Sequence, residues 1–214
     1  MSEQRSLAAQ GPEYWLRAKR ALARRDAVMG RIIRACPRIA LQSRGAPFQT
    51  LARSIVGQQI SVKAAQSVWG RLTAAAPAVT PAEVRGLGMR RLRACGLSGR
   101  KAEYLRDLAR HFENRTIHVQ RWPMMDDEAV IAELVQVRGI GRWTAEMFLI
   151  FNLLRPNVLP VDDLGLRRAA GIHYFDGGQV DAEGLRALGA RWEPWRSVAT
   201  WYLWRSLDPL PVEY

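Results

Sequence analysis

The chain has 214 residues, 48% of them hydrophobic, so it is long enough to bury one large core or two smaller ones. It carries 32 Lys and Arg against 20 Asp and Glu, a net charge of +12, and residues 1–120 alone hold 22 basic and 7 acidic side chains. This excess is typical of a protein that binds a polyanion, most simply DNA, although a solvated arginine-rich surface would share it.

Other classes are excluded by what the sequence lacks. Two cysteines, Cys36 and Cys95, are too few for a disulfide framework or a cysteine metal cage, and the three histidines show no ligand spacing. No apolar run reaches the roughly 18 residues that a membrane helix needs, and the N-terminus lacks a signal-peptide pattern. We therefore expect a soluble, intracellular protein with no membrane partner.

The first half of the chain reads as a series of helices. Residues 1–12 are polar and are expected to be flexible. Residues 13–36 predict one or two helices, and residues 48–56 predict the next. The apolar residues expected to face inward in the first of these segments are Trp15, Leu22, Met29 and Ile33.

Capping signals then mark where further helices begin. Ser61 is expected to cap a helix that runs to Ala76, with Val62, Val68 and Leu72 among its buried residues. The run from Thr80 to Glu83 has the spacing of a capping box, with proline at the first helical position. Later helices are predicted at residues 89–94, 98–112, 181–192 and 195–207, and no strand pattern of any length is present.

A glycine pair separates two helical patterns at residues 126–153. Apolar residues recur at spacings of three and four on both sides of Gly139 and Gly141. Two glycines around one residue favour a tight hairpin, because glycine accepts backbone angles that other residues resist. The second helix would then begin with free backbone N–H groups, which suit a DNA phosphate.

Four segments together resemble the 3-methyladenine DNA glycosylase II family of the helix-hairpin-helix/GPD DNA glycosylase superfamily. Residues 139–145 read Gly-Ile-Gly-Arg-Trp-Thr-Ala, and residues 160–168 read Pro-Val-Asp-Asp-Leu-Gly-Leu-Arg-Arg. Residues 56–61 and 95–102 add weaker matches, so the resemblance covers roughly residues 48–207. It implies one all-α domain over residues 1–214, with two helical lobes around a central cleft. The four-cysteine iron–sulfur cluster of some relatives cannot form here, so we expect no such cofactor.

The resemblance places a catalytic aspartate in the doublet at residues 162–163. That aspartate opens a helix and has an apolar core residue three positions later. Counted from Asp163 this residue is Leu166, whereas from Asp162 it is Gly165. We therefore assign Asp163 as catalytic and Asp162 as a cap or neighbour. The alternative is that Asp163 is an ordinary helix N-cap.

The resemblance also implies an aromatic pocket for a cationic base. Trp143 and Trp204 match family pocket positions, Trp201 is a further candidate, and Met147 stands where a relative has tyrosine. The alternative for each tryptophan is core packing. Trp143 also replaces the nucleophilic lysine of bifunctional relatives, and the only lysines are Lys19, Lys63 and Lys101. We therefore expect base removal without strand cleavage.

The remaining site residues would contact DNA or an ion. Phosphate contacts are implied for Gly139, Gly141, Arg142 and Thr144. A monovalent cation, Na⁺ or K⁺, is implied at the backbone carbonyls of Val135, Val137 and Gly139. DNA contacts are also implied for Gln58 and Gln59, of which Gln59 matches the tip that enters the DNA stack in this family. The alternative for both is a polar helix-to-helix turn.

The resulting prediction is a monofunctional DNA glycosylase of base excision repair. It would act as a monomer on double-stranded DNA, flip an alkylated purine such as 3-methyladenine out of the helix, and hydrolyse its N-glycosidic bond. Two alternatives stay open. One is a non-enzymatic DNA-binding helix-hairpin-helix module, and the other is a bifunctional glycosylase/lyase for oxidised bases.

Overall fold

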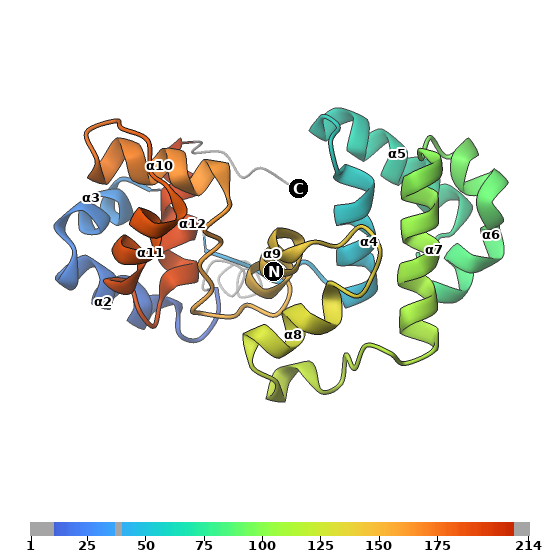
Figure 1. Ribbon diagram of the computed structural model, residues 1–214, viewed down its shortest axis with the longest axis horizontal. Helices are drawn as coiled ribbons and strands as arrows, with labels where there is room; N and C mark the ends of the chain where they lie inside the picture. The colour runs from blue at the N-terminus through green and yellow to red at the C-terminus, as the bar shows by residue number, and fades with distance from the viewer. Residues whose placement is uncertain (1–10, 37–39, 208–214) are drawn as a thin grey trace, which may run out of the picture. The chain divides into compact units, whose positions relative to one another are not determined.

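The chain folds almost entirely into helices in the computed structural model, which describes residues 11–36 and 40–207 (Figure 1). Within these residues there are eleven α-helices, one short 3-10 helix and no strand, which confirms the all-α prediction. The helices are α2 (Trp15–Arg25), α3 (Ala27–Ala35), α4 (Pro47–Gly57), α5 (Val62–Ala75), α6 (Pro81–Ala94), α7 (Gly99–Glu113), η1 (Trp122–Met124), α8 (Asp127–Leu134), α9 (Arg142–Phe151), α10 (Leu164–Tyr174), α11 (Ala182–Ala190) and α12 (Arg196–Leu207). None of those in the described ranges is long and apolar enough to cross a membrane.

Local capping chemistry explains where several helices begin. The Ser61 hydroxyl accepts a hydrogen bond from the backbone N–H of Ala64 at the start of α5. Thr80 and Glu83 exchange two bonds at the start of α6, which confirms the predicted capping box. Gly88 has φ +66° and interrupts α6, so the predicted short helix after it is the second half of a kinked one.

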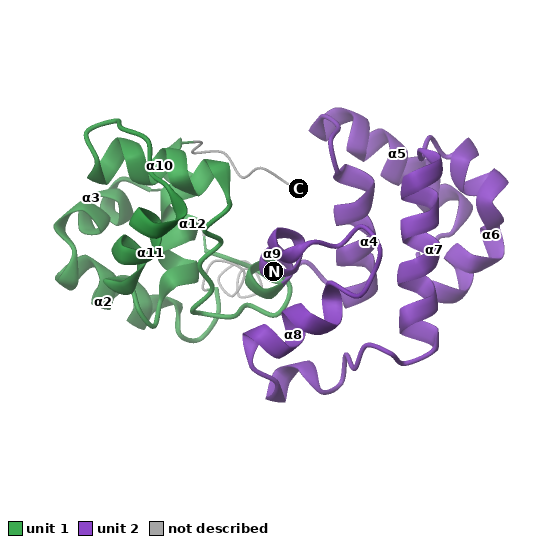
Figure 2. Ribbon diagram, in the orientation of Figure 1, with its two compact units in different colours: residues 1–43, 149–212 green, residues 44–148, 213–214 purple. Residues whose placement is uncertain are grey.

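The chain divides into two compact units, drawn in green and purple in Figure 2. Unit 1 consists of the described residues up to Ser43 and those from Leu149 onward, and unit 2 is Arg44–Phe148. Helix α9 crosses this boundary, because its residues from Leu149 onward group with unit 1. The predicted flexible segment, residues 1–12, lies mostly outside the described residues.

Unit 1 is built around α12, which packs against α2, α3 and α10. Its core is rich in aromatic rings, and Trp15 meets Trp201 edge-on at 5.2 Å between ring centroids. Asp26 is 2% exposed and caps α3, and it also accepts a hydrogen bond from Tyr174. A buried carboxylate needs such partners to offset its desolvation, so Asp26 ties α3 to α10.

Unit 2 is built around α7, which packs against α4 and α6. Phe48 of α4 meets Phe112 of α7 edge-on, at 5.1 Å between centroids. Trp122 meets Phe148 of α9 in the same way, at 5.2 Å. The first contact joins α4 to α7, and the second joins the turn before α8 to α9.

Two inward-facing predictions are wrong. Ile32 rather than Ile33 is buried in α3, because the helix begins only at Ala27 and its buried face is set by Met29 and Gly30. Val62 is 42% exposed at the first position of α5, where the burial starts only at Val68.

Candidate functional site

The glycine hairpin between α8 and α9 forms the first of two groups of predicted site residues. Its turn is closed by the backbone N–H of Ile140, which donates to Val137 O at 3.0 Å. Gly139 has φ +85°, and a Cβ there would lie 2.1 Å from Cδ2 of Tyr104. Only glycine fits this position, both for its backbone angle and for its approach to α7. Gly141 differs, because a Cβ there would meet nothing within 4 Å.

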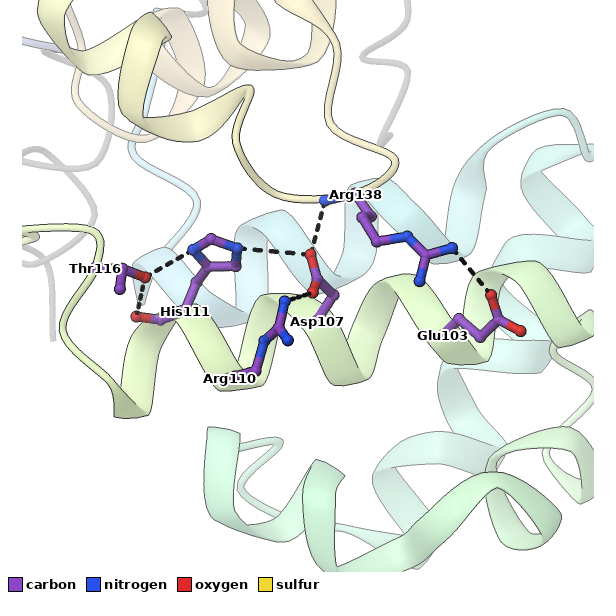
Figure 3. Close-up of polar contacts among 6 residues, drawn as sticks. All are labelled: Glu103, Asp107, Arg110, His111, Thr116 and Arg138. Carbon is purple, nitrogen blue, oxygen red and sulfur yellow. Dashed lines mark hydrogen bonds and ion pairs between the residues drawn. The ribbon is translucent and has the colours of Figure 1, made fainter.

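Two side chains from elsewhere in unit 2 hold the hairpin. Gln58, at the end of α4, donates from Nε2 to Gly139 O at 2.8 Å. The backbone N–H of Arg138 donates to Oδ2 of Asp107 at 2.9 Å (Figure 3). Since Asp107 is only 7% exposed, this carboxylate is a buried support for the loop. We call residues 135–144, with Gln58 and Asp107, the hairpin site.

The turn at the end of α4 divides its two glutamines between different roles. Gln58 faces the hairpin, and Lys101 donates from Nζ to Val56 O at 2.8 Å in the same turn. Burial lowers the pKa of Lys101. Gln59 is instead exposed, with φ +56°, at the tip of the turn. Gln59 is thus the more exposed of the two, and the predicted DNA contacts of both glutamines stay predictions.

Arg142 begins α9 with its charge already matched by carboxylates. Its Nη1 donates to Glu128 Oε2 at 2.9 Å and its Nε to Glu146 Oε1 at 3.0 Å. The hydrogen bond with Glu128 raises the pKa of Arg142 and lowers that of Glu128. The predicted phosphate contact of Arg142 therefore rests on its place at the helix N-terminus more than on its guanidinium.

The other predicted residues of α9 differ in exposure. Trp143 is 43% exposed, which is high for a tryptophan and leaves part of the ring accessible. Thr144 is buried and Met147 is half-buried. Of the two predicted pocket residues in unit 2, Trp143 and Met147, Trp143 is therefore the more exposed.

The predicted cation site can be tested against the bonds of its carbonyls. Gly139 O accepts from Gln58, and Val137 O accepts from Ile140 N. A carbonyl oxygen has two lone pairs, so these bonds leave room for one further ligand on each oxygen. Val135, Val137 and Gly139 could still hold Na⁺ or K⁺ as predicted, and no chemical step depends on that ion.

Asp163 forms the second group of predicted site residues, in unit 1. It is the N-cap of α10, and its Oδ1 accepts from Leu166 N at 2.6 Å. The same oxygen accepts from the indole Nε1 of Trp204 at 2.8 Å. Leu166 is fully buried, so the helix register that led to Asp163 is as predicted. The two donors fix the carboxylate in one orientation.

Asp162 does not cap the helix, contrary to one of its two predicted roles. It is exposed, and its Oδ1 pairs with Arg167 Nη2 at 2.9 Å. The cap geometry belongs to Asp163, because its backbone is the last extended residue before α10. Asp162 is thus a surface neighbour of the carboxylate that the doublet supplies to the site.

Two residues that the sequence did not single out complete this second group. Phe151 stacks on Trp204, at 5.7 Å between centroids and 15° between planes. Gly165 lies so close that a Cβ there would be 3.2 Å from Asp163 Oδ1 and 3.5 Å from Trp204 Cδ1. We call Asp163, Trp204, Phe151 and Gly165 the aspartate site. No spacing rule pairs Phe151 with Trp204, although both follow apolar helical patterns.

Trp201 lies in the aromatic core of unit 1. It is 5% exposed and contacts Trp15 and Tyr202 edge-on. This is the core-packing alternative that the sequence left open for each tryptophan. The structure thus brings Trp204 to the carboxylate and buries Trp201.

Two of the three lysines have their ammonium groups engaged. Lys101 is bonded to Val56 O as described above, and Lys19 lies over the ring of Tyr202, 5.9 Å from its centroid. Lys63 is exposed on α5. None of them is close to Asp163 along the chain.

Comparisons with known proteins find relatives that match most of the chain. A sequence profile described as "HhH-GPD superfamily base excision DNA repair protein" matches residues 52–194. The chain is 34% identical over 166 residues to "DNA-3-methyladenine glycosylase 1" of Schizosaccharomyces pombe, a match that covers 75% of this chain and 72% of that protein.

Two solved structures have a similar fold over most of the chain. A DNA-3-methyladenine glycosidase from Bacillus halodurans superposes with a TM-score of 0.80 at 33% identity, covering 89% of each chain. The Schizosaccharomyces pombe 3-methyladenine DNA glycosylase Mag1, in complex with abasic DNA, superposes with a TM-score of 0.78 at 28% identity. That second match covers 92% of this chain and 100% of the other.

Proposed function

This chain belongs to the HhH-GPD superfamily of base excision DNA repair proteins, and we propose that it is a monofunctional DNA glycosylase for alkylated purines such as 3-methyladenine. The relatives reported above are named as 3-methyladenine glycosylases, and one of them was solved with abasic DNA. The observation that carries the proposal is the carboxylate of Asp163, held at the N-terminus of α10 by Leu166 N and Trp204 Nε1.

The chemistry follows from the charge of the substrate. A purine alkylated at a ring nitrogen is cationic, so its glycosidic bond is weak and the base leaves as a neutral molecule. As the bond breaks, positive charge develops on the sugar, and a fixed carboxylate stabilises that charge. Water then adds to the sugar carbon and loses a proton, which leaves an abasic site. Asp163 would face the sugar and orient this water.

The bonds to Asp163 matter because they fix where its negative charge lies. Leu166 N and Trp204 Nε1 both donate to Oδ1 of Asp163. An electrostatic stabiliser that is already oriented has no reorganisation to complete when the reaction occurs. Trp204 would therefore position the carboxylate. The ring of Phe151 stacks on the indole ring of Trp204 and would hold that indole in place.

Aromatic surface supplies selectivity for a charged base. Trp143, with 43% of its surface exposed, would offer a ring face to the flipped purine. A cation over an aromatic face gains about 0.5–2 kcal/mol, which a neutral base does not gain. Met147 is half-buried on the same helix and would shape this pocket. Trp201 is left out of it because it packs in the core of unit 1.

Monofunctional action is supported by the position of the lysines. A lyase needs a nucleophilic amine to form a Schiff base with the sugar. Trp143 cannot do this, and the Lys101 ammonium is bonded to Val56 O inside unit 2. The reaction would therefore stop at the intact abasic strand.

The hairpin site would bind the DNA backbone, and Gln59 would fill the space left by the flipped base. The N-terminal N–H groups of α9 and the backbone of Gly141 suit a phosphate, because nothing lies within 4 Å of a Cβ placed on Gly141. We further propose that the two units act as one catalytic domain on one duplex. The protein would work on double-stranded DNA as a monomer.

Release of free base from methylated duplex DNA tests this proposal directly. Chromatography should detect 3-methyladenine, with the DNA strand unbroken until alkali cleaves the abasic sites. Borohydride should trap no covalent adduct. An adduct, or release of oxidised purines alone, would favour the lyase class. Tight DNA binding with no base release from any damaged duplex would favour the non-enzymatic module.

A further inference from the structure

Unit 2 contains a pocket that the proposed reaction does not use. Its volume is about 470 Å³, and it lies between α6, α7 and the hairpin residue Arg138. Four arginines line it: Arg85, Arg106, Arg110 and Arg138. A pocket of this size can hold a small group, and guanidinium groups favour phosphate because they donate two parallel hydrogen bonds.

The acidic residues of the lining are occupied by their own partners. The buried carboxylate of Asp107 pairs with Arg110, accepts from Arg138 N at 2.9 Å and lies 3.6 Å from His111 Nε2 (Figure 3). Glu103 lies 3.3 Å from Arg138 Nη2, and both side chains of this pair are about half exposed. Such an exposed pair is weak and can exchange for a stronger anion.

The guanidinium group of Arg106 has neither a hydrogen-bond nor an ion-pair partner among residues 11–36 and 40–207. It is exposed at the pocket, one position before the buried Asp107. Arg85 is engaged with Glu113, and Arg110 with Asp107. The pocket therefore combines one uncommitted guanidinium with a second, that of Arg138, which is held only by an exposed carboxylate.

We propose that this pocket binds a backbone phosphate of the DNA strand, apart from the phosphate at the hairpin. Arg138 immediately precedes Gly139, and its backbone bond to Asp107 fixes the loop against α7. A strand carries a phosphate about every 3.4 Å along the helix axis, so a strand held at the hairpin presents more of them nearby. Arg106 and Arg138 supply the side-chain charge that Arg142, paired with Glu128 and Glu146, does not.

This inference rests on the proposed function only in taking DNA as the partner, so its test uses an undamaged duplex. Fluorescence anisotropy of a labelled duplex should show Arg106→Ala weakening binding about 5- to 10-fold near 0.1 M salt, with the salt slope reduced by about 0.9. Arg106→Lys should keep the slope. Arg91→Ala, on an exposed arginine of α6 outside the pocket, is the matched control and should change both far less.

Inorganic phosphate distinguishes the two sources of the anion. At equal ionic strength, phosphate should displace duplex from the natural protein more than chloride does, and Arg106→Ala should remove that excess. Equal affinity and slope in Arg106→Ala and Arg91→Ala would overturn the proposal. If phosphate then still bound the protein, the pocket would belong to a free phosphate ligand. Absence of base release with an intact Arg106 effect would refute the glycosylase reaction and leave the pocket standing.

Discussion

The hairpin site and the aspartate site differ in whether backbone or side-chain groups are proposed to meet the DNA. At the hairpin the side chains of Gln58 and Asp107 bond the backbone of the loop, and the groups proposed to meet the phosphate there are the backbone N–H groups at the start of α9. At the aspartate site the backbone N–H of Leu166 donates to Asp163, and the proposed reaction uses the side chain of Asp163. Trp204 supports that side chain as Gln58 supports the loop.

This contrast divides binding from chemistry. Backbone N–H groups bind the phosphates of any DNA strand alike, so under the proposed function the hairpin would supply affinity without selecting a lesion. A carboxylate beside the sugar does nothing for undamaged DNA and acts only as charge develops. Changes in the hairpin site should therefore alter DNA affinity, and changes in the aspartate site should alter the rate of base release from bound DNA.

The largest effect is expected from Asp163→Asn. The amide keeps the size of the side chain but removes the negative charge that stabilises the sugar cation. Single-turnover base release at saturating protein should fall about 10³-fold, while duplex affinity stays within a factor of a few. Asp162→Asn is the matched control, because Asp162 is exposed and its carboxylate pairs with Arg167. Loss of activity in Asp162→Asn alone would reverse the assignment.

Gly139→Ala should have the next largest effect, on affinity. The backbone of the new alanine would have to adopt φ +85°, and its methyl group would collide with the ring of Tyr104. Together these cost about 2–3 kcal/mol, so the loop leaves its binding shape and duplex affinity falls about 30- to 100-fold. Thermal unfolding should shift downward as well.

Gly141→Ala separates strain from contact at the same turn. Its methyl group meets nothing within 4 Å, so the melting temperature should be unchanged. If the backbone of Gly141 approaches a phosphate, affinity should still fall. Equal affinity in Gly141→Ala and the natural protein would exclude that close approach.

Trp204→Phe should lower the rate by a smaller factor. Phenylalanine keeps a ring to stack on Phe151 but loses the indole N–H that donates to Asp163. A hydrogen bond to a charged group contributes about 1.5–3 kcal/mol, and part of that orientation serves the transition state. We expect kcat to fall about 10-fold with KM little changed. Trp201→Phe, in the core, should lower the melting temperature without this selective loss of kcat.

Local signals in the sequence predicted most of the helices and the helix register that follows Asp163. The Thr80 capping box, the Ser61 cap and the register of Leu166 after Asp163 all depend on residues within a few positions. Such short-range chemistry can be read from one sequence because helix geometry fixes which neighbours meet.

The contacts that support the two sites could not be predicted in this way. Gln58 reaches Gly139 across 81 positions, and Trp204 reaches Asp163 across 41. Periodicity shows that Trp201 and Trp204 are on one helix, but only packing against Trp15 decides which of them is buried. The ion pair of Arg142 could not be predicted for the same reason, because its partner Glu128 is on the preceding helix.

Arg142→Ala should have the smallest effect and tests that last point. A guanidinium that bonded a phosphate would, when removed, weaken binding about 10-fold and reduce the salt slope by about 0.9. Because Arg142 is paired with Glu128 and Glu146, we expect a loss below about 3-fold with the slope kept. The hydrogen bond from Arg142 lowers the pKa of Glu128, so the pair is complete at neutral pH and is lost only as the pH falls through that lowered value.

Glu128→Gln removes one competing charge from the guanidinium and should strengthen duplex binding, by about 2-fold, in the same anisotropy titration. Weaker binding in Glu128→Gln, or a reduced salt slope in Arg142→Ala, would instead support a phosphate contact by the Arg142 side chain.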